Sequence, residues 1–305
     1  MTATATVGSC TSTDEKSVTI MVNDPQVTLV DIEDQTICNG EAVSLTANAV
    51  SANALSYAWT QNEETTVIYN GQTLNRTLTT TTIYHVTVTA TEGSCTATAS
   101  DDVTVTVHPV FVAGAIATTG QTVCYGATDG FDKIGSPVKA SGGAGRIGYQ
   151  WYYNGDPIAN ATDSVYTPAA VYAQTEGNHI FTRYAVDSTC NTNLVQSTGS
   201  WVMTVSRPRL ALNDMTGQTT VCYNGNTTLT VTPNNFNGEL SHQWKKGNEV
   251  IDNSNSAVLN LSNLKDTATY TVVVTSNVGS CTITATQSIE VKTLHPTVTK
   301  PIITQ

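Results

Sequence analysis

The chain has 305 residues, of which 12% are charged and 39% are hydrophobic, and its formal net charge at pH 7 is −11. Nucleic-acid binding needs clustered Lys and Arg, and only 13 such residues are spread over the sequence, so that function is excluded. No apolar run is long enough for a transmembrane helix, and we expect no membrane insertion. Met1 leads into Thr-Ala-Thr-Ala-Thr without a signal peptide, so we expect that the natural chain begins further upstream.

In chain order, the first predicted element is a hairpin within residues 1–24. Gly8-Ser9-Cys10 is repeated later in the chain, at residues 93–95 and 279–281. The alternating segment Val18-Thr19-Ile20-Met21-Val22 has the pattern of a strand with one buried face. We therefore interpret residues 1–24 as the last hairpin of a preceding repeat, with residues 18–22 as its closing strand.

Three further repeats follow, and each opens on a strand that ends in a cysteine before a turn containing glycine. These cysteines are Cys38, Cys124 and Cys222, which are 86 and 98 residues apart (124 − 38 and 222 − 124). That spacing is the length of one β-sandwich domain. Prolines mark the boundaries and predict domains at 25–109, 110–208 and 209–293, followed by a linker or the first strand of another repeat at 294–305.

Each repeat continues with a tryptophan strand and then an alternating strand that leads to a second cysteine. The second cysteines are Cys95, Cys190 and Cys281. Alternation with period two, as in Val103-Thr104-Val105-Thr106-Val107, means that one face of a strand is buried and the other is wet. The pattern predicts an all-β fold of tandem β-sandwich domains arranged end to end.

The recurring residues resemble the Ig-like and PKD-like repeats of large secreted adhesins of Bacteroidetes. In the first repeat the matching residues are Cys38, Gly40, Leu45, Thr46, Tyr57, Trp59, Tyr84, Val86, Val88, Gly93 and Cys95. The third repeat supplies Cys222, Gly225, Leu229, Thr230, Trp244, Tyr270, Val272, Val274, Gly279 and Cys281. The second repeat departs most, with Phe181 in place of tyrosine and a glycine-rich insertion at 141–145. The resemblance implies immunoglobulin-like sandwiches in a secreted, non-enzymatic, cell-surface protein.

The tryptophan that recurs in each repeat is expected in the core, at positions Trp59, Trp151 and Trp244. Tyr84 and Tyr270 stand two residues before Val86 and Val272. In antibody-type domains a cysteine occupies the position of these valines and bonds across the two sheets. The usual bridge between the sheets is therefore expected to be absent.

Seven cysteines in a secreted chain predict disulfides. The simplest pairing lies within each repeat, as Cys38–Cys95, Cys124–Cys190 and Cys222–Cys281, with Cys10 left unpaired. An alternative stays open, because Cys38 and Cys95 are expected at opposite poles of one sandwich, while bonded cysteines have Cα atoms within about 7 Å. Bonds between adjacent repeats, such as Cys38–Cys190 and Cys124–Cys281, are that alternative. We expect the pairing within repeats, since both cysteines recur in every repeat.

Aromatic residues of the second repeat are candidate ligand contacts. Tyr152 and Tyr153 follow the core residue Trp151, and Trp201 lies on the closing strand of this repeat alone. With Trp151 inward, strand alternation places Tyr152 outward. Exposed aromatic rings can stack on a glycan or contact a host surface protein. The alternative interpretation is that these are ordinary β-forming residues without a ligand.

Acidic residues near the first repeat are weak calcium candidates, because calcium takes hard carboxylate oxygens. They are Asp31, Glu33, Asp34, Asp101 and Asp102. The interpretation that we favour is a solvated acidic edge that discourages pairing between molecules, so no cofactor is expected. The resemblance to Bacteroidetes proteins also implies O-glycosylation at Asp-Ser/Thr motifs, with Ser164, Ser188 and Thr267 as the candidate sites.

Five histidines lie singly, without the spacing of metal ligands or a Ser-His-Asp motif, so we expect no enzyme. The leading hypothesis is a stalk at the cell surface whose partners are the neighbouring repeats of the same chain. One alternative is a module that binds glycans or host proteins through the second domain. Another is a subunit of a surface filament that self-assembles by strand addition.

Overall fold

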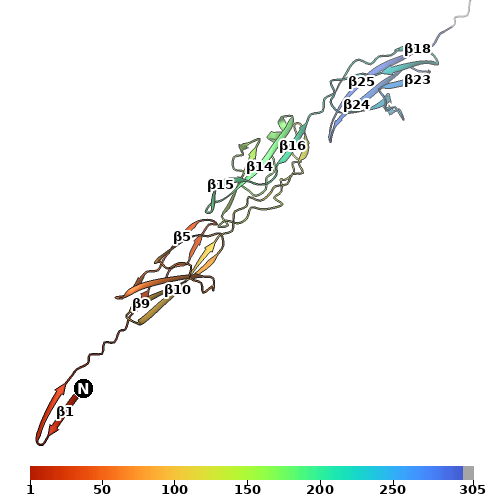
Figure 1. The fold of residues 1–305 in the computed structure, drawn as a ribbon. Coiled ribbons are helices and arrows are strands. Elements are labelled where there is room, and N and C mark those ends of the chain that lie inside the picture. Colours follow the sequence, from red (N-terminus) through yellow and green to blue (C-terminus); the bar gives the residue numbers. More distant parts are fainter. Residues whose placement is uncertain (298–305) are drawn as a thin grey trace, which may run out of the picture. The chain divides into compact units, whose positions relative to one another are not determined.

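Alternating β-branched residues form β-strands throughout the structure, a computed structural model that describes residues 1–297 (Figure 1). The only helical segment in that range is the 3₁₀ helix Ala170–Gln174. The chain divides into two compact units. The first unit holds residues 1–112, 141–147 and 186–193, and the second holds the remainder. Of the strand expected at 294–305, residues 298–305 lie outside the described residues.

The N-terminal hairpin consists of β1 (Thr2–Val7) and β2 (Cys10–Glu15), drawn in red in Figure 1, and both strands are exposed along their whole length. The strand predicted at residues 18–22 is wrong, because this segment belongs to no strand. The register explains the difference. Thr2 already lies opposite Glu15, so residues beyond the end of β2 have no partner on β1.

The first repeat is a sandwich around one apolar core. Its strands are β3 (Thr28–Leu29), β4 (Gln35–Ile37), β5 (Ala42–Thr46), β6 (Ala49–Val50), β7 (Ala54–Gln61), β8 (Thr73–Thr77), β9 (Thr82–Glu92) and β10 (Cys95–Val107). The main sheet has the order β4-β10-β9-β7, and β5–β8 and β3–β6 form separate pairs. Leu45 and Leu74 of β5–β8 share a core cluster with Trp59, Val86 and Val105 of the main sheet. Burial of that cluster holds the two layers together.

The second repeat has one regular sheet, in the order β11-β16-β14-β12-β13 with β15 paired to β14. Its strands are β11 (Gln121–Cys124), β12 (Ile147–Tyr153), β13 (Asp156–Pro157), β14 (Gly177–Asp187), β15 (Asn191–Gln196) and β16 (Trp201–Ser206). Much of the remaining chain is held by isolated bridges, including Ala115↔Val138 and Ile134↔Tyr166. This repeat therefore has fewer ladder hydrogen bonds outside its main sheet than the other two.

The third repeat returns to the pattern of the first. Its strands are β17 (Ala211–Leu212), β18 (Thr220–Cys222), β19 (Gly225–Thr230), β20 (Pro233–Asn234), β21 (Glu239–Lys246), β22 (Glu249–Val250), β23 (Val258–Leu264), β24 (Ala268–Val278) and β25 (Cys281–Leu294). The main sheet has the order β18-β25-β24-β21-β22, beside the pairs β19–β23 and β17–β20. As in the first repeat, the opening cysteine strand runs parallel to the closing strand.

The three recurring tryptophans occupy equivalent core positions. Each is 0% exposed. Each indole N–H donates a 2.9 Å hydrogen bond to the carbonyl twelve residues downstream, in the pairs Trp59–Gly71, Trp151–Asp163 and Trp244–Ser256. Val86 and Val272 lie directly across the sheet from Trp59 and Trp244. The three repeats thus share one core geometry.

Candidate functional site: disulfides between consecutive repeats

The first cysteine site is formed where an opening strand ends. β4 runs parallel to the last residues of β10, with Ile37 opposite Val107, and Cys38 follows directly. The Cys38 N–H donates to Glu41 Oε2 at 2.9 Å, which fixes the turn after the strand. The Cys38 side chain is 8% exposed.

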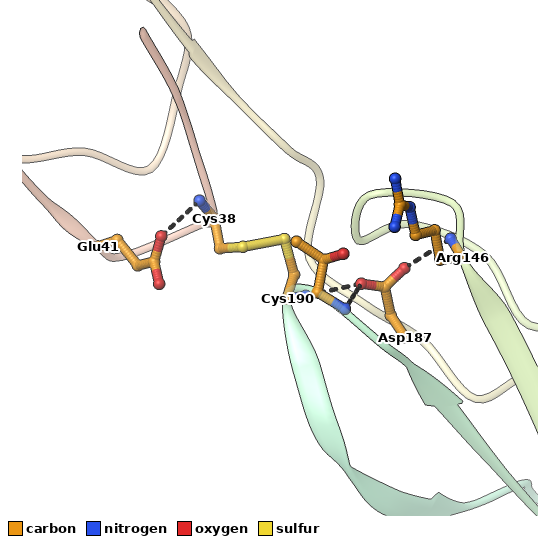
Figure 2. Close-up of a disulfide and its surroundings, with 6 residues drawn as sticks. Cys38, Glu41, Arg146, Asp187 and Cys190 are labelled. Atoms are coloured by element: carbon orange, nitrogen blue, oxygen red, sulfur yellow. Dashed lines mark hydrogen bonds between the residues drawn. A yellow bond between two sulfur atoms is a disulfide. The ribbon is translucent and has the colours of Figure 1, made fainter.

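Its partner, Cys190, is held by a buried carboxylate in the hairpin between β14 and β15. Asp187 is 0% exposed and accepts backbone N–H bonds from Cys190 at 2.7 Å, Arg146 at 3.0 Å and Thr189 at 3.1 Å (Figure 2). These donors favour the ionised form, and the bond from Cys190 contributes most to lowering the pKa of Asp187. Asp187 therefore stabilises the backbone that carries the Cys190 sulfur.

Two disulfides join cysteines of consecutive repeats. Cys38 bonds to Cys190 with Cα atoms 5.3 Å apart and a sequence separation of 152. Cys124 bonds to Cys281 with Cα atoms 5.4 Å apart and a separation of 157. Both distances fall in the usual range for disulfides. Each bond links the strand-end cysteine of one repeat to the hairpin cysteine of the next.

The pairing that we expected within repeats is wrong. Neither Cys38–Cys95, nor Cys124–Cys190, nor Cys222–Cys281 is formed. In the first repeat, Cys95 begins β10 and Ile37 lies opposite its last residue, Val107. A strand of that length, at about 3.3 Å per residue, separates Cys38 from Cys95 by about 40 Å. The observed pairs are those of the alternative, in which the two cysteines of one repeat lie at opposite poles of the sandwich and bond to adjacent repeats.

Three cysteines have no disulfide partner within residues 1–297, namely Cys10, Cys95 and Cys222, and all three are exposed. Cys10 was expected to be unpaired, whereas Cys95 and Cys222 were expected to be bonded. Cys95 has the hairpin position of Cys190 and Cys281, and Cys222 has the strand-end position of Cys38 and Cys124.

We predict that Asp187→Asn weakens the hairpin that holds Cys190 and changes its response to acid. Because the folded pKa of Asp187 is lowered, its contribution is present above the unfolded pKa of about 4 and is lost as the pH falls toward the folded value. Hydrogen exchange of residues 186–193 between pH 6 and pH 3 measures this. The wild-type chain should lose protection on acidification, and Asp187→Asn should start lower and change less.

The control for this experiment is Asp156→Asn, at an exposed residue of β13. It should follow the wild-type profile. Parallel profiles for Asp187→Asn and the wild type would contradict the role given to this carboxylate.

Of the three aromatic ligand candidates, Trp201 is wrong because it is buried. Trp201 is 2% exposed and packs edge-on against Phe181, with ring centroids 5.9 Å apart. The Tyr153 hydroxyl group is hydrogen-bonded to His179 Nδ1 at 2.7 Å, and its half-buried ring packs against the core of the second repeat. Both side chains follow the inward alternation of their strands. Tyr152 is half-buried and pairs with Tyr184, with ring centroids 4.6 Å apart.

Several of the acidic calcium candidates serve as hydrogen-bond acceptors within the first repeat. Asp101 accepts the Ile32 N–H at 2.7 Å, and Asp34 accepts the Thr104 N–H at 2.7 Å. Across residues 1–297, no group of three or more His, Cys, Asp or Glu side chains has the arrangement of a metal site. These carboxylates tie the segment before β4 to β10.

A hydroxyl–imidazole–carboxylate chain lies on the outer face of the first repeat. His85 Nδ1 is 2.7 Å from Asp102 Oδ1, and His85 Nε2 is 3.2 Å from Thr87 Oγ1. The side chains of His85 and Asp102 are 44% and 71% exposed, beside a pocket of about 380 Å³. Asp102 lies directly opposite His85 in the sheet register. We assign the pair to cross-strand stabilisation, which is small for exposed charges.

The candidate glycosylation residues have different surroundings. Ser188 and Thr267 are exposed, and the Thr267 hydroxyl group accepts the Thr293 N–H at 3.1 Å. Ser164 is half-buried, and its carbonyl accepts a 2.7 Å hydrogen bond from Arg183.

The structure adds a buried arginine that the sequence reasoning did not single out. Arg183 is 0% exposed and occupies the position that Val86 and Val272 hold in the other repeats, two residues after Phe181. Its guanidinium donates to Ser136 Oγ, Ser197 Oγ and the carbonyl groups of Ala113, Ala115, Val138 and Ser164. The inward place of Arg183 in an alternating strand was the available signal.

Comparison with known families matches residues 25–109 to a family described as "Ig-like domain CHU_C associated". Among solved structures, a titin I-band fragment, I67–I69, is 11% identical, covers 90% of this chain and 100% of that one, and has a TM-score of 0.45. Drosophila OTK extracellular domains 3–5 are 13% identical, cover 92% and 100%, and have a TM-score of 0.32.

The first three domains of the outer capsid protein Hoc of bacteriophage RB49 are 14% identical, cover 90% of this chain and 100% of that one, and have a TM-score of 0.38. No curated protein sequence is significantly similar to this chain. Within residues 1–297, no helix is both long and apolar enough to cross a membrane. With the sandwich layers and the matched domain together, the chain is a tandem of immunoglobulin-like β-sandwich domains.

Proposed function

We propose that this chain is a non-enzymatic extracellular spacer in which consecutive immunoglobulin-like repeats are covalently tied together. The observation that carries the proposal is the overlap of the two disulfides. Cys124 lies inside the segment closed by Cys38–Cys190, and Cys190 lies inside the segment closed by Cys124–Cys281. A disulfide within one repeat stabilises that repeat alone against unfolding. Overlapping disulfides also hold consecutive repeats together when the connection between them is stretched.

The length of the closed segments supports a stabilising role. On the chain-entropy account, closing about 150 residues lowers the entropy of the unfolded chain by the equivalent of about 5 kcal/mol for one bond. A catalytic site would require a cluster of titratable groups in a sheltered cleft. The exposed Thr87–His85–Asp102 chain does not provide that shelter.

The cell-surface location rests on the chemistry of the bonds. Disulfides persist in oxidising compartments such as the extracellular space and the cell surface. The family description of residues 25–109 and the resemblance to Bacteroidetes adhesin repeats support the finer proposal, a stalk region of a bacterial surface adhesin.

Peptide mapping under non-reducing conditions tests the bonds on which the proposal depends. The chain should be recovered from an oxidising compartment, with free thiols alkylated before digestion. We expect linked peptides for Cys38–Cys190 and Cys124–Cys281, and alkylated Cys10, Cys95 and Cys222. Linked peptides that join Cys38 to Cys95, or Cys222 to Cys281, would refute it.

A second function, glycan binding by the second repeat, is favoured by the pair of adjacent tyrosine rings Tyr152–Tyr184 on β12 and β14, whose centroids are 4.6 Å apart. A glycan array probed with the oxidised chain tests it. If this pair is a sugar platform, Tyr152→Ala should reduce binding at least about fivefold, since a stacking contact is of the order of 1 kcal/mol or more. Tyr69→Ala, at a tyrosine 41% exposed in the first repeat, is the control. An array on which no glycan binds the chain would rule out this second function, and the spacer function would then be the one that remains.

A further inference from the structure

The strand-end cysteine of the third repeat is presented in the same way as the bonded one of the second. Cys124 lies opposite Ser206 of the closing strand, and Cys222 lies opposite Leu294. The N–H of the following residue, Tyr125 or Tyr223, donates to the carbonyl of that same partner at 2.9 Å in both repeats.

The residue after each of these two cysteines is also packed in the same manner. The Tyr125 ring lies 4.3 Å from the Arg207 guanidinium carbon, and the Tyr223 ring lies 4.7 Å from the His295 ring. Arg207 and His295 each directly precede a proline at the end of their repeat. Cys222 therefore stands in the local structure of a cysteine that is bonded in the preceding repeat, although it is itself exposed and unbonded.

The hairpin cysteines repeat equally closely. Cys95 and Cys281 each follow a two-residue Gly-Ser turn and lie opposite the residue before that turn. Gly93 and Gly279 both have φ of +61°, as the first position of a type II′ hairpin turn requires. Cys281 is bonded to Cys124 and is 1% exposed, whereas Cys95 is free and exposed. In the bonded hairpin it is the Cys281 side chain that is buried, while Gly279, Ser280 and Thr282 around it stay exposed.

From these matches we infer that Cys222 and Cys95 are the two open halves of the same inter-repeat disulfide. Cys222 forms a disulfide with the hairpin cysteine of another immunoglobulin-like repeat of this type. Cys95 forms a disulfide with the strand-end cysteine of such a repeat. This inference extends the proposed function, because it rests on bonds between repeats being the general rule of the chain. The partner repeat belongs either to the same polypeptide or to a second copy, and its chemistry is the same in both.

The bond forms by thiol–disulfide exchange with a small disulfide oxidant such as oxidised glutathione. The Cys222 thiolate attacks one sulfur of the oxidant, which forms a mixed disulfide and releases one thiolate. The hairpin thiolate of the partner repeat then attacks the Cys222 sulfur and releases the second thiolate. Two protein thiols lose two protons and two electrons, and one oxidant disulfide becomes two thiols.

The test adds a partner repeat directly after the third repeat, in the way that the second repeat follows the first and the third follows the second. A second copy of residues 209–296 is inserted directly after Pro296, which keeps the basic-residue–Pro–Arg209 junction found at Arg207-Pro208. After oxidation with glutathione, peptide mapping should show Cys222 joined to Cys281 of the inserted copy. Alkylation of Cys222 should fall about tenfold or more relative to the original chain.

The matched control carries Cys281→Ser in the inserted copy only, and in it Cys222 should remain fully reactive. If Cys38–Cys190 and Cys124–Cys281 form, Cys222 stays free beside a folded inserted copy and the unextended chains described below form no dimer, the inference is overturned while the proposed function stands. If those two native bonds also fail to form, both the inference and the proposed function are refuted. Protection of the inserted Trp244 indole N–H from exchange reports whether that copy is folded.

A second measurement uses the unextended chain and identifies the source of the partner. Chains with Cys10→Ser and either Cys95→Ser or Cys222→Ser are mixed with oxidised glutathione. Dimers joined through Cys222 and Cys95 support the inference with a second copy as partner. Monomers together with the bond in the extended chain support it with the same polypeptide as partner. Monomers and no bond in the extended chain overturn it.

Discussion

Stretched from its two ends by single-molecule force spectroscopy, the oxidised chain is expected to extend by no more than about 240 Å between Cys38 and Cys281, while the reduced chain reaches about 850 Å. The limit follows from the covalent paths. The reduced path contains 243 residues (281 − 38), at about 3.5 Å per extended residue. In the oxidised chain, the shortest path crosses from Cys38 to Cys190, follows 66 residues (190 − 124) back to Cys124, and then crosses to Cys281.

Because the bonds overlap, the loss of either one lengthens this limit only a little. One longer path follows 86 residues (124 − 38) from Cys38 to Cys124 and then crosses to Cys281. A second path crosses first from Cys38 to Cys190 and then follows 91 residues (281 − 190) to Cys281. Cys38→Ser leaves the first path and Cys124→Ser leaves the second, so each variant should still stop at about 300–320 Å. The double variant should extend to about 850 Å.

This non-additivity is specific to overlapping bonds. If each disulfide closed a single repeat, the closed loops would follow one another along the chain. Removal of any one bond would then add the length of the loop that it had closed, independently of the others. Cys10, Cys95 and Cys222 are replaced by Ser in all variants, so that exchange with free thiols does not rearrange the bonds. Equal and additive lengthening by Cys38→Ser and Cys124→Ser would rule out the overlapping arrangement.

Arg183→Val is expected to destabilise the second repeat by about 3 kcal/mol or more. The other two repeats carry valine at this position, so repeat matching alone suggests a favourable change. The structure predicts the opposite, because the guanidinium supplies donors to four backbone carbonyl groups and two hydroxyl groups. Their loss leaves buried acceptors without partners and a cavity where the guanidinium lay against the Tyr149 ring.

Hydrogen exchange measured repeat by repeat separates this effect from the rest of the chain, since tandem domains need not unfold together. Protection in β12, β14 and β16 should fall sharply, and protection in the third repeat should stay near the wild-type level. Arg209→Val is the control, because Arg209 forms a partly exposed ion pair with Glu176 and should cost less than about 1 kcal/mol. A second repeat of unchanged stability would show that Arg183 is dispensable.

The fold was predictable from the sequence because its signals are local and repeated. Period-two alternation, glycine turns and one tryptophan per repeat placed the strands and the buried faces, and the three tryptophans are fully buried. The same alternation indicates that Trp201 points inward, so that ligand candidate failed because an aromatic residue was taken as exposed without following its strand. The strand predicted at residues 18–22 was wrong because alternation indicates which face of a strand is buried, but not whether a neighbouring strand is available for pairing.

The cysteine pairs were decided by tertiary structure alone. Recurrence within each repeat identified which cysteines belong to the framework, but a disulfide depends on a separation of a few ångströms between residues far apart in sequence. The length of β10 puts Cys38 and Cys95 at opposite ends of one domain, and only the fold brings Cys190 to Cys38. Likewise, the sequence determined that Arg183 points inward, whereas its partners come from irregular segments that no periodicity marks.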